Sequence, residues 1–192
     1  MNTHDESQNI FMSFILLGDV SKILDQLLLH DNTLDGMAKS EYSTHFSKEI
    51  NYWKKTLSKI GNVTQQWISA QEKWKDLSKA FAIKGFKDSL ENENGSGFED
   101  LNKRFVRIMT ETTKKPTVKD CCLVENRYEN LRSLSEELDV FKGNMTKALE
   151  LKRKQFPRFF FLSDEELICV LGGSIREPTV QRLVKEGIFM AQ

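Results

Sequence analysis

The sequence has little proline, little cysteine and no long apolar run, and each shortage excludes a class of structure. With only 3 prolines in 192 residues, long uninterrupted helices are permitted. The 3 cysteines are odd in number and lack metal-ligand spacing, so we expect them to be reduced. No apolar stretch approaches the roughly 20 residues of a membrane span, so we expect no membrane partner.

Net charge and catalytic motifs are missing as well. The 28 basic and 28 acidic residues cancel, which argues against attraction to nucleic acid. None of the 10 glycines lies in the Gly-x4-Gly-Lys-(Ser/Thr) frame whose backbone amides hold phosphate. His4, His30 and His45 are scattered and have no obvious nucleophile beside them. We therefore expect a chain that is not an enzyme and needs no cofactor or metal.

What the chain does contain is helical periodicity. Apolar residues step by three and four from Phe46 to Ile60, and the same seam continues at intervals of seven. The pattern predicts one helix over residues 45–82, about 55 Å long at 1.5 Å per residue, or two nearly collinear helices with a bend at Gly61-Asn62. The aromatic residues that we expect in the core of this seam are Trp53, Trp67, Trp74 and Phe81.

A second seam of heptad character, from Tyr128 to Ala148, predicts another long helix. Shorter helices are expected over residues 20–28, 98–113, 167–171 and 180–184, with connections at 31–42 and 85–97. Rods of this length do not fit into a sphere of 192 residues, whose radius of gyration would be about 16 Å. The predicted fold is therefore all-α, an elongated bundle of long amphipathic helices with short breaks.

A proline-centred corner should join the second long helix to the next one. Pro157 lacks an N–H and biases Phe156 away from helical angles, so the preceding helix should stop near Gln155. Ser163 and Glu166 have the spacing of a capping box, which predicts that a new helix starts there. A helix–bend–helix corner of this kind also occurs in α-helical proteins without any special function.

The four phenylalanines of this corner are apolar enough to require burial. On an extended segment, alternate side chains face opposite sides. We therefore expect Phe159 and Phe161 to pack on one helical layer, and Phe160 to face either another layer or a part of the protein outside this chain. Phe156 belongs to the same apolar group.

Basic residues cluster beside the corner, and two interpretations of them stay open. Positive charge at the end of a helix interacts favourably with its dipole, which gives these residues a purely structural role. Alternatively, they form a docking contact to an acidic protein surface. The candidate docking residues are Lys152, Arg153 and Arg158.

The corner also resembles the linker of dynein heavy chains, the arm that moves over the AAA+ ring of these microtubule motors. The shared pattern is a Lys-Arg pair, then Phe-Pro-Arg-Phe-Phe-Phe, then Ser-Asp-Glu-Glu-Leu. The residues that carry it are Lys152, Arg153, Phe156, Pro157, Arg158, Phe159, Phe160, Phe161, Ser163, Asp164, Glu165, Glu166 and Leu167.

A second stretch carries the same resemblance. Trp67, Gln71 and Trp74 are similar to the family's Trp-x3-Gln-x2-Trp pattern. The resemblance implies a frayed N-terminus at 1–9, a helical linker segment at 10–188, and a truncated tail at 189–192. The chain would then be a fragment that lacks the AAA+ ring.

The resemblance implies a mechanical function. The nucleotide state of the ring would switch the linker between bent and straight forms, and so drive movement along microtubules. The partners would be the remainder of the heavy chain and the dynein complex, with microtubules contacted only indirectly and no nucleic acid or membrane involved. The location would be the cytoplasm and cytoskeleton, with a cilium or axoneme as an alternative.

A different class of function also accounts for part of the pattern. A non-motor helical scaffold or coiled-coil adaptor would explain the two heptad seams. It would not explain the Phe-Pro-Arg-Phe-Phe-Phe corner. An enzyme is the third candidate, and no motif supports it.

The missing phosphate-binding loop yields a direct test. We expect that the isolated chain neither binds nor hydrolyses ATP, because no backbone loop of the required kind is present. Equilibrium titration with a fluorescent ATP analogue measures this, and saturable binding at micromolar concentration would contradict it.

Overall fold

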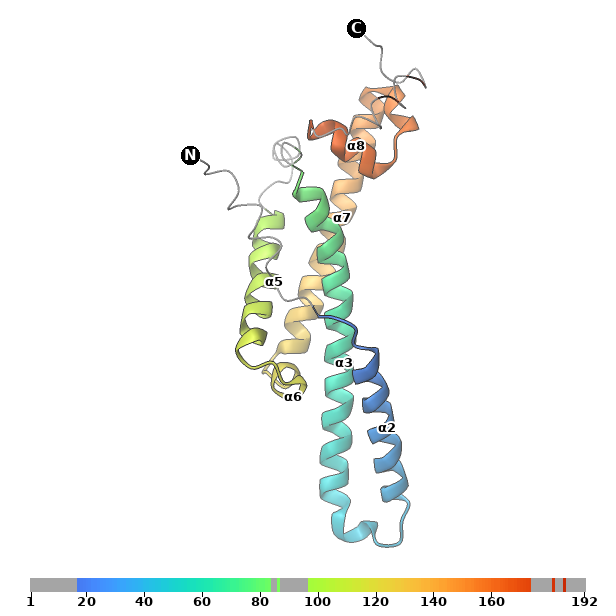
Figure 1. Cartoon of the computed structure of the whole chain (residues 1–192), viewed down its shortest axis with the longest axis vertical. Helices are drawn as coiled ribbons and strands as arrows, with labels where there is room; N and C mark the ends of the chain where they lie inside the picture. Colours follow the sequence, from blue (N-terminus) through green and yellow to red (C-terminus); the bar gives the residue numbers. More distant parts are fainter. Residues whose placement is uncertain (1–16, 84–85, 87–96, 174–180, 182–184, 186–192) are drawn as a thin grey trace. The chain divides into compact units, whose positions relative to one another are not determined.

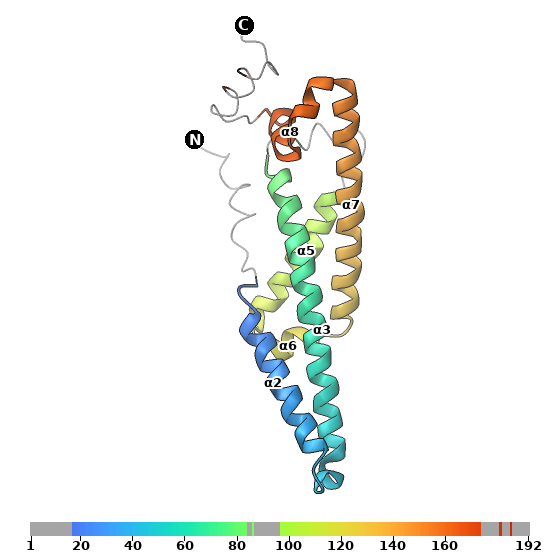
Figure 2. The same cartoon turned by 90° about the vertical axis from the view of Figure 1, so that its right-hand side faces the viewer.

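The computed structural model describes residues 17–83, 86, 97–173, 181 and 185. Within these residues the secondary structure is helical and contains no strand, so the predicted all-α class is confirmed. Its elements, shown in Figures 1 and 2, are α2 (Ser21–Ala38), α3 (Ser43–Phe81), α5 (Gly97–Lys114), α6 (Val118–Cys122), α7 (Arg127–Gln155), the 3-10 helix η1 (Pro157–Phe161) and α8 (Asp164–Leu171).

Some predictions fall outside this range. The ends at 1–9 and 189–192 lie outside the described residues, as does most of the helix expected at 180–184. The chain divides into two compact units. Unit 1 consists of residues 1–13, 73–105 and 136–192, and unit 2 consists of residues 14–72 and 106–135.

The two long helices follow the two predicted seams. Helix α3 is continuous over 39 residues, and α7 is continuous over 29 residues. Gly61, the candidate bend, lies inside α3 without interrupting it. A glycine in a helix costs only about 1 kcal/mol relative to alanine, so the apolar residues around it keep the helix intact.

Helix α2 is longer than its sequence pattern predicts, since it continues to Ala38 through part of the expected connection at 31–42. Lys54 of α3 donates a hydrogen bond to Asp35, which ties the last turns of α2 to α3. That hydrogen bond lowers the pKa of the Asp35 carboxyl and raises the pKa of Lys54. A partner distant in sequence therefore extends the helix. Figures 1 and 2 both show α2 beside the first half of α3.

The start of α2 also differs slightly from the prediction. The expected helix started at residue 20, but α2 starts at Ser21 and Val20 occupies its cap position. Asp19 accepts hydrogen bonds from the backbone N–H and the hydroxyl of Ser21, at 2.9 and 2.5 Å. These bonds lower the pKa of the Asp19 carboxyl. The aspartate thus still satisfies a donor of the first helical turn, from one position further out.

In unit 2, the core forms around Trp67 of α3. Its indole N–H lies 3.4 Å from the Met109 sulfur of α5, and the Arg127 guanidinium of α7 lies 5.5 Å from its ring. Thr64 lies 3.7 Å from the Cys122 sulfur of α6. All these side chains are buried, so α3 contacts α5, α6 and α7 within this unit.

In unit 1, aromatic rings form the core. Trp74 stacks on Phe105 of α5 with centroids 4.5 Å apart, and its indole N–H donates to Asn102 at 2.9 Å. Phe81 stacks on Phe98 at 4.5 Å and contacts Phe141 of α7 at 5.4 Å. The polar edge of the indole is therefore satisfied inside an otherwise apolar layer.

The prediction that Trp53 belongs to the core is wrong. Trp67 and Trp74 are 2% and 3% exposed, as expected, and Phe81 is half-buried, but Trp53 is 42% exposed. Lys119 lies over its ring at 5.1 Å, and Tyr52 contacts its edge. Periodicity marks the side of a helix that is suited to burial, but it does not state how far along the helix a cover extends.

The three tryptophans provide a matched stability test. Trp67→Ala and Trp74→Ala should each lower the free energy of unfolding by about 3–5 kcal/mol, because each leaves a large cavity. Trp53→Ala should cost only about 1 kcal/mol, since it removes a partly exposed ring and one cation–π contact. Urea unfolding followed by circular dichroism measures all three, and equal losses would contradict this description of the core.

Candidate functional site

The corner of unit 1 is the candidate site that the sequence predicts. Helix α7 ends at Gln155, as expected, and Pro157 occupies the first turn of η1. The amide of Phe156 still donates to the Lys152 carbonyl at 3.0 Å, and the amide of Phe159 donates to the Phe156 carbonyl at 2.8 Å. The chain therefore turns without losing its backbone hydrogen bonds, since the missing N–H of proline falls where no partner is needed.

Arg153 joins the two sides of the corner. Its guanidinium, on the last turn of α7, donates to the Leu162 carbonyl at 3.0 Å and to the Asp164 carboxylate at 2.6 Å. Its side chain is only 13% exposed. Asp164 is the first residue of α8. The Arg153 side chain therefore binds both the backbone that connects η1 to α8 and the start of α8 itself.

The predicted capping box at the start of α8 is present. The Ser163 hydroxyl accepts from the Glu166 amide at 3.3 Å, and the Glu166 carboxylate accepts from the Ser163 amide at 3.0 Å. Three acidic residues occupy the first turn of α8, where the helix dipole stabilises negative charge. The position at which α8 starts is therefore determined locally.

An apolar cluster supports the corner from inside. Leu162, Leu167 and Ile168 are buried together with Ala148 and Leu149 of α7. Because α7 and α8 share this cluster, the angle between them depends on packing as well as on Arg153.

Within this chain, only Phe159 of the four corner phenylalanines is partly buried, so the expected packing of Phe161 beside it is wrong. Phe159 packs against the apolar cluster and contacts the ring of Phe156, with centroids 5.3 Å apart. Phe156, Phe160 and Phe161 are 57%, 62% and 73% exposed. The expected pairing of Phe159 with Phe161 fails because the segment is a 3-10 helix instead of an extended strand, so side chains three apart share a face.

The structure divides the basic cluster into two groups. Arg153 is engaged inside the corner, so it is not available as a docking residue in this structure. Lys152 is half-buried, and Arg158 is exposed. The sequence contained the residues of the Arg153–Asp164 pair but no signal for it, because a spacing of eleven residues across a bend follows no helical period.

Gln71 has a role that sequence reasoning did not assign. Its side chain accepts from the Leu17 amide at 2.8 Å and donates to the Leu17 carbonyl at 3.0 Å. This two-point contact fastens the segment before α2 to α3 within unit 2. The Trp-x3-Gln-x2-Trp spacing was the available signal, since it places one amide side chain between two buried tryptophans.

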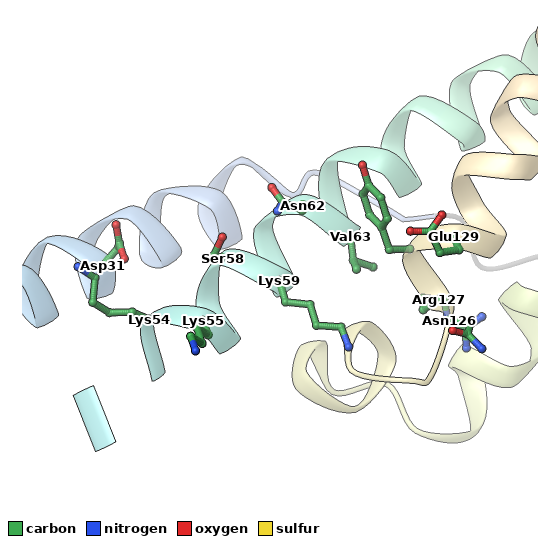
Figure 3. A pocket seen from close by; sticks show the side chains of 11 residues that line it. Asp31, Lys54, Lys55, Ser58, Lys59, Asn62, Val63, Asn126, Arg127 and Glu129 are labelled. Carbon is green, nitrogen blue, oxygen red and sulfur yellow. The ribbon is translucent and has the colours of Figure 1, made fainter. Parts of the chain in front are cut away.

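Unit 2 also contains an open polar groove of about 750 Å³ between α2, α3 and the start of α7. Figure 3 shows Lys59 extending along it toward Asn126. The groove carries four basic and two acidic side chains, and Lys54 and Arg127 are already paired with Asp35 and Glu111. The charges that remain balance, so the groove has no net preference for an ion of either sign.

The cysteines are free, as expected. Cys121 and Cys122 are buried, and burial raises the pKa of both thiols. Cys169 is half-buried. Protonated thiols are poor nucleophiles, which suits a structural role.

The described part of the chain contains neither a metal-binding cluster nor a membrane-spanning helix. No group of three or more His, Cys, Asp or Glu residues there could hold a metal ion. None of the helices described is both long and apolar enough to cross a membrane.

Comparison with known proteins reveals consistent similarity. Residues 1–191 match the family model "Dynein heavy chain, N-terminal region 2". The chain is 38% identical over 161 residues to human dynein axonemal heavy chain 10, which covers 83% of this chain. It is 32% identical over 164 residues, 84% of this chain, to the dynein-1-alpha heavy chain of the flagellar inner arm I1 complex of Chlamydomonas reinhardtii.

A cytoplasmic relative is similar as well. The cytoplasmic dynein heavy chain of Dictyostelium discoideum is 27% identical over 152 residues, which covers 79% of this chain. These matches span 4%, 3% and 3% of the three relatives, so the chain corresponds to a small part of their length.

The Arg153 contact can be tested against its neighbour in sequence. Arg153→Gln should lower the free energy of unfolding by about 1–3 kcal/mol, because two charge-assisted hydrogen bonds are lost near a buried layer. Lys154→Gln, a change at an exposed position, should stay within about 0.5 kcal/mol of the parent. Hydrogen exchange should speed up across α8 only in Arg153→Gln, and identical behaviour of the two variants would remove Arg153 from the corner's stability.

Proposed function

Because this chain belongs to the dynein heavy chain family, we propose that it is a mechanical segment of the heavy chain's linker. In this role it contributes to the lever that couples the ATPase state of an AAA+ ring to movement along microtubules. The segment is itself non-catalytic, and nucleotide hydrolysis takes place elsewhere in the heavy chain.

The corner between α7 and α8 is the observation that carries this proposal. A lever that transmits force around a bend must keep the angle of that bend fixed. Here the two helices are joined by five residues of 3-10 helix, two hydrogen bonds from Arg153, a capping box and a shared apolar cluster. Together these contacts restrain the angle between the two helices.

The helices on either side of the joint suit the same role. A packed α-helix resists bending, because bending stretches its backbone hydrogen bonds. Helix α7 brings 29 continuous residues to the joint, and its buried face carries Leu134, Leu138 and Leu149. A force applied to α8 would therefore pass into a long helix instead of a loop.

The partners and the location follow from the same proposal. The segment would act with the rest of its heavy chain, including the AAA+ ring, inside a dynein complex, and would contact microtubules only indirectly. The axonemal relatives support a cilium or axoneme as the location, and the cytoplasmic relative supports the cytoplasm and cytoskeleton. Membership of a motor family favours this role over a non-motor scaffold or adaptor.

The experiment measures force transmission separately from nucleotide binding. In an intact motor that carries this segment, Pro157→Gly should slow microtubule gliding, because glycine at this position widens the angles that the joint can adopt. Arg153→Met should act in the same direction by releasing α8 from α7. Binding of a fluorescent nucleotide analogue by the ring should remain largely unchanged in both variants.

Lys154→Met is the matched control, since it removes an exposed charge beside Arg153 and leaves the joint intact. It should glide at the parental speed. Equal loss of gliding and nucleotide binding in Pro157→Gly would assign the corner to folding instead of force transmission. Parental gliding in both corner variants would exclude the corner from the mechanism.

A further inference from the structure

The seam of α3 is covered along most of its length but not at its beginning. Trp53, Ile60 and Trp67 repeat at intervals of seven, so they lie on one side of the helix. Ile60 and Trp67 are buried, whereas Trp53 is 42% exposed. Phe46 lies two turns before Trp53 on the same side of the helix, and it is 63% exposed. Ile50, between Phe46 and Trp53 on the seam, is buried at 7%. The first part of the seam therefore has the composition of a core, but Phe46 and Trp53 in it lack a cover.

The uncovered part of the seam forms a groove, which we call the hairpin groove. It has a volume of about 330 Å³ and is lined by residues of unit 2 from the end of α2 to the start of α3. Figures 1 and 2 show these two helix ends next to each other. Its lining residues are Leu34, Met37, Ser40, Tyr42, Ser43, Phe46, Glu49, Ile50 and Trp53.

The residue types in the hairpin groove are those of a contact surface. Tyr, Trp, Phe and Met are enriched at protein interfaces, and here four such side chains gather in one depression. Tyr42 and Met37, at its rim, are more than half exposed, as is Phe46. Exposed aromatic side chains that gather in one depression are suited to contact with another structural element.

The covered part of the same seam indicates which kind of element fills the groove. Within unit 2, Trp67 contacts Met109 of α5 and Arg127 of α7, so the cover there consists of helices. The cover thins at Trp53, where Lys119 of α6 lies over the ring at 5.1 Å. Since the seam continues with the same spacing beyond that point, its natural continuation is another helix lying along α2 and α3.

We propose that the hairpin groove binds an amphipathic α-helix from a part of the same heavy chain outside residues 1–192. The helix presents apolar side chains at i, i+3 or i+4, and i+7 to Phe46 and Trp53, since Ile50 between them is already buried. It carries a Lys or Arg opposite Glu49, the one charged residue among those that line the groove. The chain spans 4% of its human relative, so a heavy chain of that length contains many further segments to supply this helix.

The inference rests on the proposed function only in placing the chain within a longer heavy chain, and not on movement of the corner. Its test is site-specific photo-crosslinking in the intact heavy chain, with p-benzoylphenylalanine at position 46 or at position 53. Lys48 is the matched control, because it is exposed on the same turns of α3 and lies on the opposite side from Phe46. Mass spectrometry of the crosslinked peptides identifies the occupant.

We expect crosslinks from positions 46 and 53 to one helical segment of the same heavy chain, and none above background from position 48. Mixing isotope-labelled and unlabelled heavy chains distinguishes a crosslink within one copy from a crosslink between two copies. Crosslinks to a second copy, to a different subunit, or to nothing would each overturn the proposal. Because nucleotide binding and gliding are not read out, failure here leaves the test of the corner unaffected.

The occupant can also be tested by substitution. Phe46→Ala should abolish the crosslink from position 53, because it removes a largely exposed aromatic ring that lines the groove. Lys48→Ala should leave that crosslink at its parental yield. Circular dichroism of the 192-residue chain should be the same for both variants, since both side chains are exposed. A parental crosslink in Phe46→Ala would contradict the seating of a helix in the groove.

Discussion

Burial of the apolar seam of α3 is the interaction on which both compact units depend. In unit 2 the seam contributes Trp67, whose ring contacts Met109 and Arg127. In unit 1 it contributes Trp74, whose ring stacks on Phe105 while its N–H binds Asn102. Large rings at successive heptad positions allow one helix to organise two separate cores, because each ring buries enough apolar surface to hold its neighbours in place.

The corner works by a different principle, since it combines a polar contact with an apolar layer. Burial of Leu162 and Leu167 brings α8 against α7, but apolar packing alone permits small rotations. The hydrogen bonds of Arg153 have fixed directions and reduce that freedom. The three phenylalanines that remain exposed at the corner show that apolar composition alone does not decide which side chains the fold covers.

Much of the secondary structure was predictable, because it depends on residues close together in sequence. The end of α7 at Gln155, the capping box at Ser163 and the limits of α5 all follow from proline geometry, side-chain caps and periodicity. The end of α2 was not predictable in this way, because it is held by the pairing of Asp35 with Lys54. The corner was recognisable as a site, but the contact that holds it was not, since Arg153 and Asp164 follow no local pattern.

The sequence by itself determined that the described chain is helical, where its long helices run, and which side of each helix is apolar. These features depend on torsional preferences and on a period of about 3.6 residues, both of which act over a few turns. Only the tertiary structure decided which members of each seam are covered. Trp53 and Trp67 have the same place in the heptad, yet one is exposed and the other buried. Burial depends on what lies opposite a side chain, and helices far away in the sequence supply that cover.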